Sequence, residues 1–98
     1  MATPLSIDTV QRDGEVVLTA AGEIDLSNVE EFSGALTAAG TDGSRLIVDL
    51  SEVLYLDSGA INVLFSNAGR IRLIANPILM PVLRISGLTD VAVVEQSA

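Results

Sequence analysis

The sequence lacks cysteine, histidine, lysine and tryptophan. Without cysteine there is no disulfide, no thiol nucleophile and no thiolate zinc site. Without histidine there is no imidazole for acid–base catalysis. Aromatic residues make up only 3% of the chain, so few rings are present on which a base or a cofactor could stack. We therefore expect a protein that is not an enzyme, with no cofactor and no catalytic residue.

Positive charge is scarce. Thirteen acidic residues stand against five arginines, which gives a formal net charge of −8. A chain this acidic is repelled by phosphate backbones, so we expect no direct binding to nucleic acid. An acidic surface suits a basic protein partner, and it equally serves solubility.

Long apolar runs are also absent. The apolar stretches are broken by Asp, Arg, Asn or Pro well short of the about 20 residues that a membrane-spanning helix needs. The segment 1–15 has neither the basic nor the apolar part of a signal peptide. We therefore expect a cytoplasmic protein outside the membrane. The 98 residues are 49% hydrophobic, and we expect residues 1–98 to form one domain around a single core.

Hydrophobic periodicity predicts a hairpin followed by alternating helices and strands. Residues 5–10 ("LSIDTV") alternate apolar and polar side chains, and residues 15–22 resemble a second strand. Between them, "RDGE" favours a tight turn, because Asp-Gly tolerates positive φ. The remaining expected strands are 45–50, 70–75 and 91–96, and the expected helices lie within 22–40, 60–69 and 76–88, with a loop at 41–44.

Local signals mark the ends of the helices. Ser27 followed by Glu30 fits a capping box at the start of the first helix. In the third helix, Pro81 must lie in the first turn, because deeper inside it would remove a hydrogen bond, and Gly87 fits the end. The resulting order β-β-α-β-α-β-α-β is typical of an α/β protein with parallel strand pairs and helical crossovers.

The stretch Asp57-Ser58-Gly59 lies between an expected strand and an expected helix, where α/β folds commonly meet ligands and partners. Asp57 or Ser58 can accept hydrogen bonds from the first N–H groups of the helix, which is a purely structural role. Ser58 has no histidine or lysine to deprotonate it, so catalysis fits poorly. A phosphorylated side chain would fit well, since a helix N-terminus stabilises an anion.

Three nearby carboxylates, Asp49, Glu52 and Asp57, could in principle bind a cation. Their spacing across a strand and a loop is not diagnostic of any metal site. We therefore expect no bound metal.

Three stretches together resemble the STAS domains of anti-sigma-factor antagonists. "GEIDLSN" (22–28) resembles the family's Gly-Glu-Leu-Asp turn, and residues 46–65 resemble its strand, Asp-Ser-Ser-Gly-Leu loop and second helix. Residues 77–88 resemble its third helix, which closes on Ser-Gly-Leu. The three occur in the family's order and span most of the chain. The resemblance implies the STAS-domain fold, in which an N-terminal β-hairpin and then alternating helices and strands form a mixed sheet with helices packed mainly on one face.

The resemblance also implies a function. In this family the unmodified antagonist binds an anti-sigma factor of the serine/threonine-kinase type and releases a sigma factor. The kinase then phosphorylates the loop, and the added charge separates the two proteins. This makes Ser58 the phosphorylation candidate, and Asp25 is expected to face the same turn. The partner-binding candidates are Asp25, Leu26, Ser27, Asp57, Ser58, Gly59, Ala60 and Ile61.

The sequence departs from the family pattern at this loop. Without gaps, Gly59 stands where the family has its phosphate acceptor. A one-residue gap would put Ser58 there instead, but it would rotate the apolar positions of the helix by about 100°. We therefore favour the ungapped register, in which Ser58 is only a neighbouring hydroxyl. The segment between Phe65 and Arg70 is also short, which predicts a stubby second helix.

A second role remains open within the same family. A small STAS protein can serve as the accessory subunit of a lipid or solute ABC transporter, docking on its ATPase, and loss of the phosphate acceptor is natural there. The sequence leaves the partner and the oligomeric state undetermined.

Overall fold

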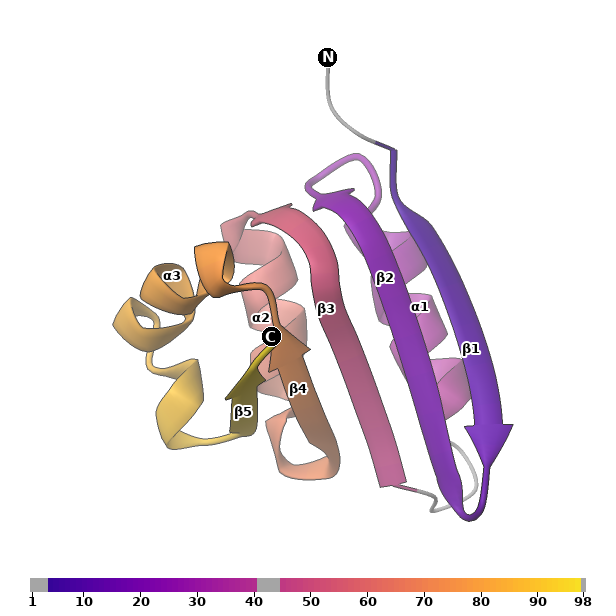
Figure 1. Cartoon of the computed structure of the whole chain (residues 1–98). Helices are drawn as coiled ribbons and strands as arrows, with labels where there is room; N and C mark the ends of the chain where they lie inside the picture. Colours follow the sequence, from indigo (N-terminus) through magenta and orange to yellow (C-terminus); the bar gives the residue numbers. More distant parts are fainter. Residues whose placement is uncertain (1–3, 41–44, 98) are drawn as a thin grey trace.

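The computed structural model describes residues 4–40 and 45–97, so the loop expected at 41–44 lies outside the described residues. The N-terminal hairpin and the alternating elements appear in the expected order (Figure 1). The strands and helices are β1 (Ser6–Arg12), β2 (Glu15–Ile24), α1 (Val29–Ala39), β3 (Arg45–Leu56), α2 (Ser58–Ser66), β4 (Ile71–Ala75), α3 (Met80–Ile85) and β5 (Val93–Gln96), with short 3₁₀ turns η1 (Ala68–Arg70), η2 (Pro77–Leu79) and η3 (Leu88–Asp90).

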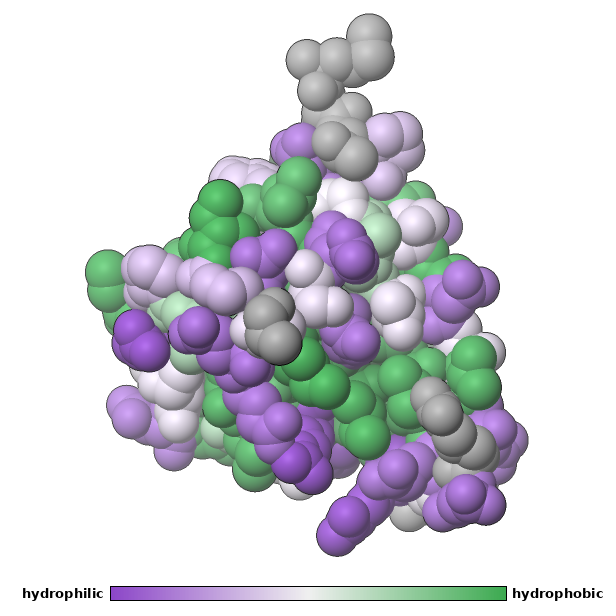
Figure 2. All heavy atoms as spheres, viewed as in Figure 1, coloured by the Kyte–Doolittle hydropathy of each residue, from purple (hydrophilic) through white to green (hydrophobic). Residues whose placement is uncertain are grey.

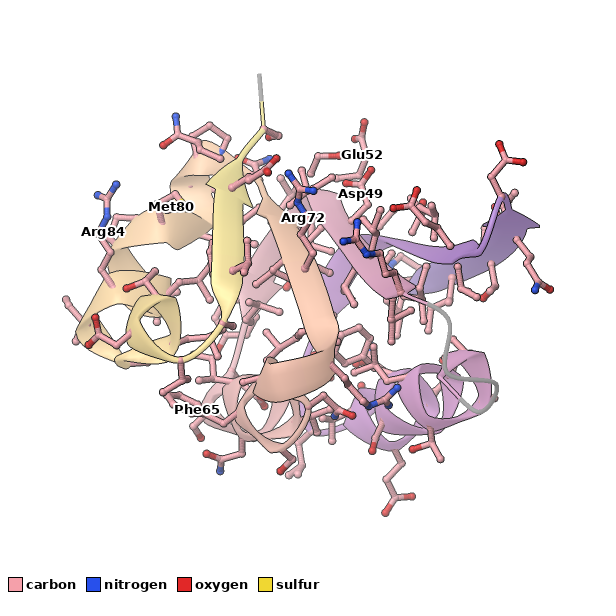
Figure 3. The ribbon with its side chains drawn as sticks, turned by 90° about the horizontal axis from the view of Figure 1, so that it is seen from below. Asp49, Glu52, Phe65, Arg72, Met80 and Arg84 are labelled. Carbon is pink, nitrogen blue, oxygen red and sulfur yellow. The ribbon has the colours of Figure 1, made fainter. Side chains whose placement is uncertain are left out.

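The strands form one mixed sheet in the order β1-β2-β3-β4-β5. The β1–β2 pair is antiparallel and the other three pairs are parallel. Helices α1 and α2 cover one face of the sheet, while α3 lies beside β5 (Figures 1 and 3). This arrangement confirms the expected fold class, a mixed sheet with its helices mainly on one face. We call the opposite side of the sheet the open face.

The hairpin turn forms as the sequence predicts. Asp13 and Gly14 both have positive φ, 48° and 80°. This is the left-handed conformation that a two-residue turn between twisted antiparallel strands requires.

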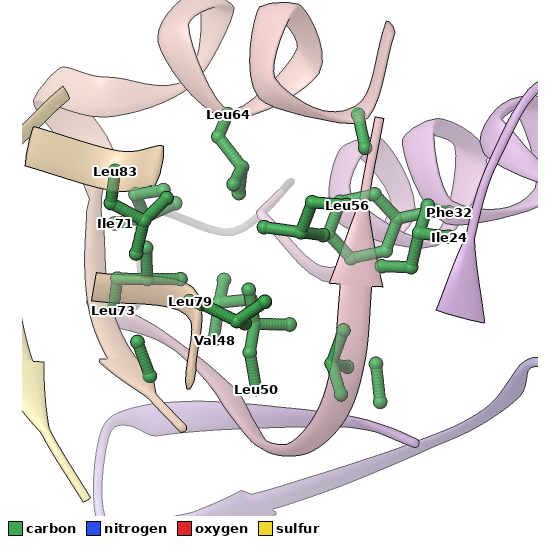
Figure 4. Close-up of a cluster of buried hydrophobic side chains, with 14 of the residues drawn as sticks. Ile24, Phe32, Val48, Leu50, Leu56, Leu64, Ile71, Leu73, Leu79 and Leu83 are labelled. Carbon is green, nitrogen blue, oxygen red and sulfur yellow. The ribbon is translucent and has the colours of Figure 1, made fainter. Parts of the chain in front are cut away.

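The core fills the space between the sheet and its helices. Along β2, buried and partly buried residues alternate, which is the period-2 pattern of a half-covered strand. The buried side chains of the sheet, among them Val48, Leu50 and Leu73, belong to one cluster with Phe32 of α1 and Leu64 of α2 (Figure 4). In the described residues no buried side-chain nitrogen or oxygen lacks a hydrogen-bond partner.

Strand β3 is longer than the expected 45–50, because two irregularities let it continue past Leu50. Relative to β2, β3 carries an extra residue after Asp49 and another after Val53. Each extra residue shifts the period-2 pattern, so the buried positions become Leu50, Val53 and Leu56. Because buried residues three apart do not show the alternation typical of a strand, the sequence does not predict the part of β3 beyond Leu50.

The third helix is shorter than the expected 76–88. It divides into η2 and α3, because Pro81 has no N–H with which to continue a ladder from the preceding turn. Pro81 lies in the first turn of α3, as expected, and Gly87 follows the helix with φ 88°. Asn76 accepts a hydrogen bond from the backbone N–H of Ile78 (3.0 Å) and so caps η2.

The second helix is stubby, as predicted, since α2 has nine residues and passes directly into η1. None of the helices in the described residues is both long and apolar enough to cross a membrane.

The packing of α2 makes a first testable prediction. Replacing the fully buried Leu64 by alanine removes core contacts and leaves a cavity, so Leu64→Ala should lower the free energy of unfolding by about 2–5 kcal/mol. Ile85 on α3 is 87% exposed, and Ile85→Ala should change it by less than about 0.5 kcal/mol. Urea denaturation of both variants measures the difference. Equal losses in the two variants would contradict this packing.

Candidate functional site

Asp57 joins β3 to α2 and caps the helix. Its backbone is extended (φ −88°, ψ −179°), and its Oδ1 accepts a hydrogen bond from the backbone N–H of Ala60 (2.9 Å). The carbonyl of Asp57 accepts from the N–H of Ile61 (3.1 Å). Of the two caps that the sequence allows, Asp57 is therefore the one that forms, and Ser58 is free of the capping role.

Ser58 is the first residue of α2 and is exposed. Its hydroxyl makes no hydrogen bond within residues 4–40 and 45–97. The next position, Gly59, carries no hydroxyl, but it has room for one. A Cβ there would lie 3.3 Å from Oδ1 of Asp57 and 4.0 Å from Cγ2 of Val29, so a serine fits after a shift of a few tenths of an ångström.

The loop between β2 and α1 is held by its own side chains. Oδ1 of Asp25 accepts from the backbone N–H of Ser27 (2.9 Å) and from its hydroxyl (2.5 Å). The side chain of Asn28 accepts from the N–H of Asp25 (2.9 Å) and donates to the carbonyl of Glu23 (2.9 Å). These four hydrogen bonds fix the conformation of the short loop between β2 and α1.

The expected capping box from Ser27 to Glu30 is therefore wrong. Asn28, not Ser27, is the N-cap residue of α1, and its side chain makes no capping hydrogen bond. The hydroxyl of Ser27 donates to Asp25 instead. A local turn around an aspartate competes with helix capping for the same serine, and here the turn prevails.

The two loops lie next to each other because the sheet continues between them. The backbone N–H of Asp57 donates to the carbonyl of Ile24 (3.1 Å), one residue before Asp25. The carboxylate of Asp25, however, is engaged with Ser27. Among the described residues, no hydrogen bond joins Asp25 to residues 57–59, so the two loops are linked through the backbone.

The pKa of Asp25 is held below its ordinary value. The hydrogen bond from the Ser27 hydroxyl is the larger cause and the backbone N–H of Ser27 the second, while slight desolvation acts in the opposite direction. Asp25 therefore presents a negative charge beside the first helix at neutral pH and well into the acid range.

Exposed apolar side chains accompany these polar loops. Leu26 is 85% exposed, and at the end of β3 Leu54 and Tyr55 are about half exposed. We use the term carboxyl-end surface for Asp25, Leu26, Ser27, Leu54, Tyr55, Asp57, Ser58 and Gly59. Sequence reasoning missed Leu54 and Tyr55, because the irregularity after Val53 turns two consecutive residues away from the core.

Two expected members of this surface belong elsewhere. Ala60 is fully buried and Ile61 is 9% exposed, so both side chains face the core. They share the inward face of α2 with Leu64, at the spacing of three and four residues that places helical side chains on one side. We therefore remove Ala60 and Ile61 from the set that a partner would contact.

A family model described as "Mlab, STAS domain" matches residues 7–95. The chain belongs to the STAS-domain family. No curated protein matches it in a sequence comparison.

Solved structures give the same fold for this STAS domain. An anti-sigma factor antagonist from Mycobacterium paratuberculosis is similar at 22% identity, with 94% of this chain and 86% of that chain covered and a TM-score of 0.86. The antagonist SpoIIAA in its unphosphorylated form is similar at 21% identity, with coverages of 97% and 89% and a TM-score of 0.72. The phosphorylated form of the Bacillus cell fate determinant SpoIIAA is similar at 24% identity, with coverages of 97% and 92% and a TM-score of 0.58.

The carboxylates considered for a cation have other contacts or stand apart in this STAS domain. Asp49 accepts from the N–H (2.9 Å) and the hydroxyl (2.6 Å) of Ser51, and Asp57 caps α2. No group of three or more His, Cys, Asp or Glu side chains suited to a metal ion occurs in the part of the chain that the structure describes.

The cap at Asp57 can be tested by substitution. Asp57→Ala removes the acceptor for the N–H of Ala60 and should cost about 1 kcal/mol of unfolding free energy. Asp57→Asn keeps an oxygen in the same place and should lose less than half of that. Chemical denaturation measures the loss of unfolding free energy in both variants. Equal losses in Asp57→Ala and Asp57→Asn would show that the carboxylate acts by charge rather than by capping.

The pKa of Asp25 can be tested through Ser27. Ser27→Ala removes the hydroxyl donor, so the pKa of Asp25 should rise towards its ordinary value, while Ser33→Ala should leave it unchanged. Because the pKa is lowered by folding, the bond stabilises the loop above the unfolded pKa, about 4, and the contribution is lost as the pH falls through the folded pKa. Carboxyl ¹³C NMR titration measures both effects. An unchanged pKa in Ser27→Ala would contradict the assigned bond.

Proposed function

We propose that this STAS domain is an anti-sigma-factor antagonist, a binding module without catalytic activity that binds an anti-sigma factor of the serine/threonine-kinase type and releases a sigma factor. The observation that carries the proposal is the match to an anti-sigma factor antagonist over 94% of this chain at a TM-score of 0.86. The absence of histidine, lysine and cysteine from the whole sequence agrees with a role in binding rather than catalysis.

The carboxyl-end surface is the proposed docking site. Leu26, which is 85% exposed, offers apolar area that a partner would remove from water, at about 25 cal/mol per Å² of area buried. Asp25 beside it carries a persistent negative charge that favours a basic partner surface. The hydrogen bonds within the loop restrain these side chains before binding, which lowers the entropy cost of docking.

Ser58 is the proposed site of phosphorylation. Its hydroxyl is exposed at the first residue of α2, where the helix N-terminus stabilises added negative charge. A phosphate adds a charge of about −1.5 to −2 at neutral pH. On this acidic domain, that charge would oppose the desolvation that docking requires and so release the partner.

Gly59 favours one alternative function. With glycine at the family's acceptor position, phosphate control can be absent altogether. The same surface would then serve a constitutive contact, as in a STAS accessory subunit that docks on the ATPase of a lipid or solute ABC transporter.

A matched pair of surface variants tests the docking site. Leu26 is 85% and Ile85 is 87% exposed, so Leu26→Asp and Ile85→Asp introduce the same charge at equally exposed apolar positions. Binding to candidate anti-sigma kinases from the same genome is measured with ADP or ATP present. Leu26→Asp should weaken binding by at least about tenfold, since a buried unpaired charge costs more than 1.4 kcal/mol, and Ile85→Asp by less than about twofold.

Equal loss in both variants would contradict docking through the carboxyl-end surface. Failure of the unsubstituted protein to bind any such kinase, together with stable binding to a transporter ATPase, would replace the antagonist proposal by the alternative.

Phosphorylation is tested by intact mass after incubation with the bound kinase and ATP. We expect one added phosphate, absent in Ser58→Ala and present again in Ser58→Ala/Gly59→Ser, where the acceptor moves one position. A phosphate that persists in Ser58→Ala would place the modification elsewhere, and binding without any phosphate would point to an antagonist free of phosphate control.

A further inference from the structure

The open face of the sheet carries an apolar row. The strand register aligns one residue from each strand across this face, namely Val10, Val17, Ile47, Arg72 and Val93. Four of the five are apolar and β-branched, and at the two edges of the sheet Val10 is 52% and Val93 60% exposed. Figure 2, viewed onto this face, shows apolar side chains crossing the sheet with hydrophilic side chains on either side.

The pairing of the strands gives this face a reason to be covered. Strands β2 to β5 pair in parallel, and parallel sheets are usually packed on both faces. In the part of the chain that the structure describes, α1 and α2 cover one face only, and α3 lies beside β5 (Figures 1 and 3). A stripe of β-branched side chains on a sheet is suited to packing against a second sheet, whose side chains interdigitate with it.

Charges of opposite sign lie on the two sides of the row. On β3, Arg45 comes two residues before Ile47 and Asp49 two residues after it, so all three share the open face. Figure 3 shows Asp49 and Arg72 on the side of the sheet away from α1 and α2. Arg72 lies within the row and is paired with Glu95 of its own chain, so the pair adds no net charge.

A second copy of the chain is complementary to this pattern. A two-fold axis along the row would bring Ile47 onto the partner subunit's Ile47 and Arg45 opposite the partner subunit's Asp49, and symmetry would form the second contact twice. Glu15, which neighbours Arg45 on β2, would face the partner subunit's uncharged Thr19, because these two residues lie equally far from Val17. The two copies would therefore meet through apolar residues and opposite charges, although each carries a net charge of −8.

The size of the face sets the strength of such a dimer. Five strands spaced about 4.8 Å apart are about 24 Å across, and five residues of a strand span about 17 Å, so the face offers roughly 400 Å² of flat area per copy. Two copies would bury about 800 Å², which is the size of a weak, transient protein contact. We therefore expect a reversible dimer with a Kd of about 0.1 mM.

We propose that the open face is the interface of a weak, two-fold symmetric dimer of this chain. Val10, Val17 and Ile47 pack on the same residues of the second copy, and Arg45 pairs with the partner subunit's Asp49. The dimer does not rest on the proposed antagonist function. Its interface shares no residue with the carboxyl-end surface, so each copy in the dimer keeps its own docking site.

Sedimentation velocity of the full chain, over a range of concentrations that spans the expected Kd, tests the apolar row. The weight-average mass should rise from that of one chain towards that of two. Val10→Asp should raise the Kd by at least about tenfold, because the new charge would lose its water in the interface. Val91 is the matched control, since it is 54% exposed and follows η3, which packs against α2 and α3. Val91→Asp should change the Kd by less than about twofold.

A second pair of variants tests the charges. Arg45→Glu and Arg84→Glu both make the net charge more negative by two, so they increase the general repulsion between copies equally. Both arginines are exposed, but Arg84 lies on α3 and outside the open face. Arg45→Glu should raise the Kd by at least about tenfold, because it places like charges opposite each other at two symmetric positions. Arg84→Glu should raise it by less than about threefold.

Three results would overturn the proposal. A chain that stays monomeric at 1 mM would rule out the dimer. Equal weakening within either matched pair would reduce the association to non-specific contact, and a dimer that survives both Val10→Asp and Arg45→Glu would form through another face. All four variants alter exposed side chains, and an unchanged circular dichroism spectrum verifies that each is folded.

Discussion

The parallel pairing of β2 with β3 is the constraint on which the rest of the structure depends. These strands lie at the centre of the sheet, and their pairing runs from Glu15 and Arg45 at one end to Ile24 and Leu56 at the other. One further backbone bond, from Asp57 to Ile24, carries the alignment into the two loops beyond. The same pairing therefore sets the position of the carboxyl-end surface.

A short motif, Asp-Leu-Ser, occurs twice: at the first irregularity of this pairing, in β3, and in the loop that follows β2. In residues 25–27 and 49–51 the aspartate Oδ1 accepts from the serine N–H at 2.9 Å and from its hydroxyl, at 2.5 and 2.6 Å. The outcome for the leucine differs, because Leu26 is 85% exposed in a loop and Leu50 is fully buried in β3. The same local turn thus exposes Leu26 to solvent in the loop. In β3 it accompanies an irregularity of the strand while Leu50 stays in the core.

Sequence reasoning predicted most of the fold, because alternation, Asp-Gly and Pro81 act locally. It was wrong for Ser27, whose hydroxyl could either cap helix α1 or donate to Asp25. In the structure only the bond to Asp25 forms. It also placed Ala60 at the partner surface, although Ala60 is fully buried. A sequence motif shows which residues belong to a loop, but it does not show which residues of the next helix face the core. The ion pair between Arg72 and Glu95 could not be predicted, because it depends on the register of β4 with β5.

The central claim is that partners dock on the carboxyl-end surface. A chemical-shift map of the isotope-labelled domain bound to an anti-sigma kinase, the proposed partner, tests it most directly. The account predicts that the largest backbone shifts fall in residues 24–28 and 54–59, with small shifts at Arg45, Arg72 and Ile85. A footprint centred on the open face or on α3, with residues 24–28 unperturbed, would contradict it.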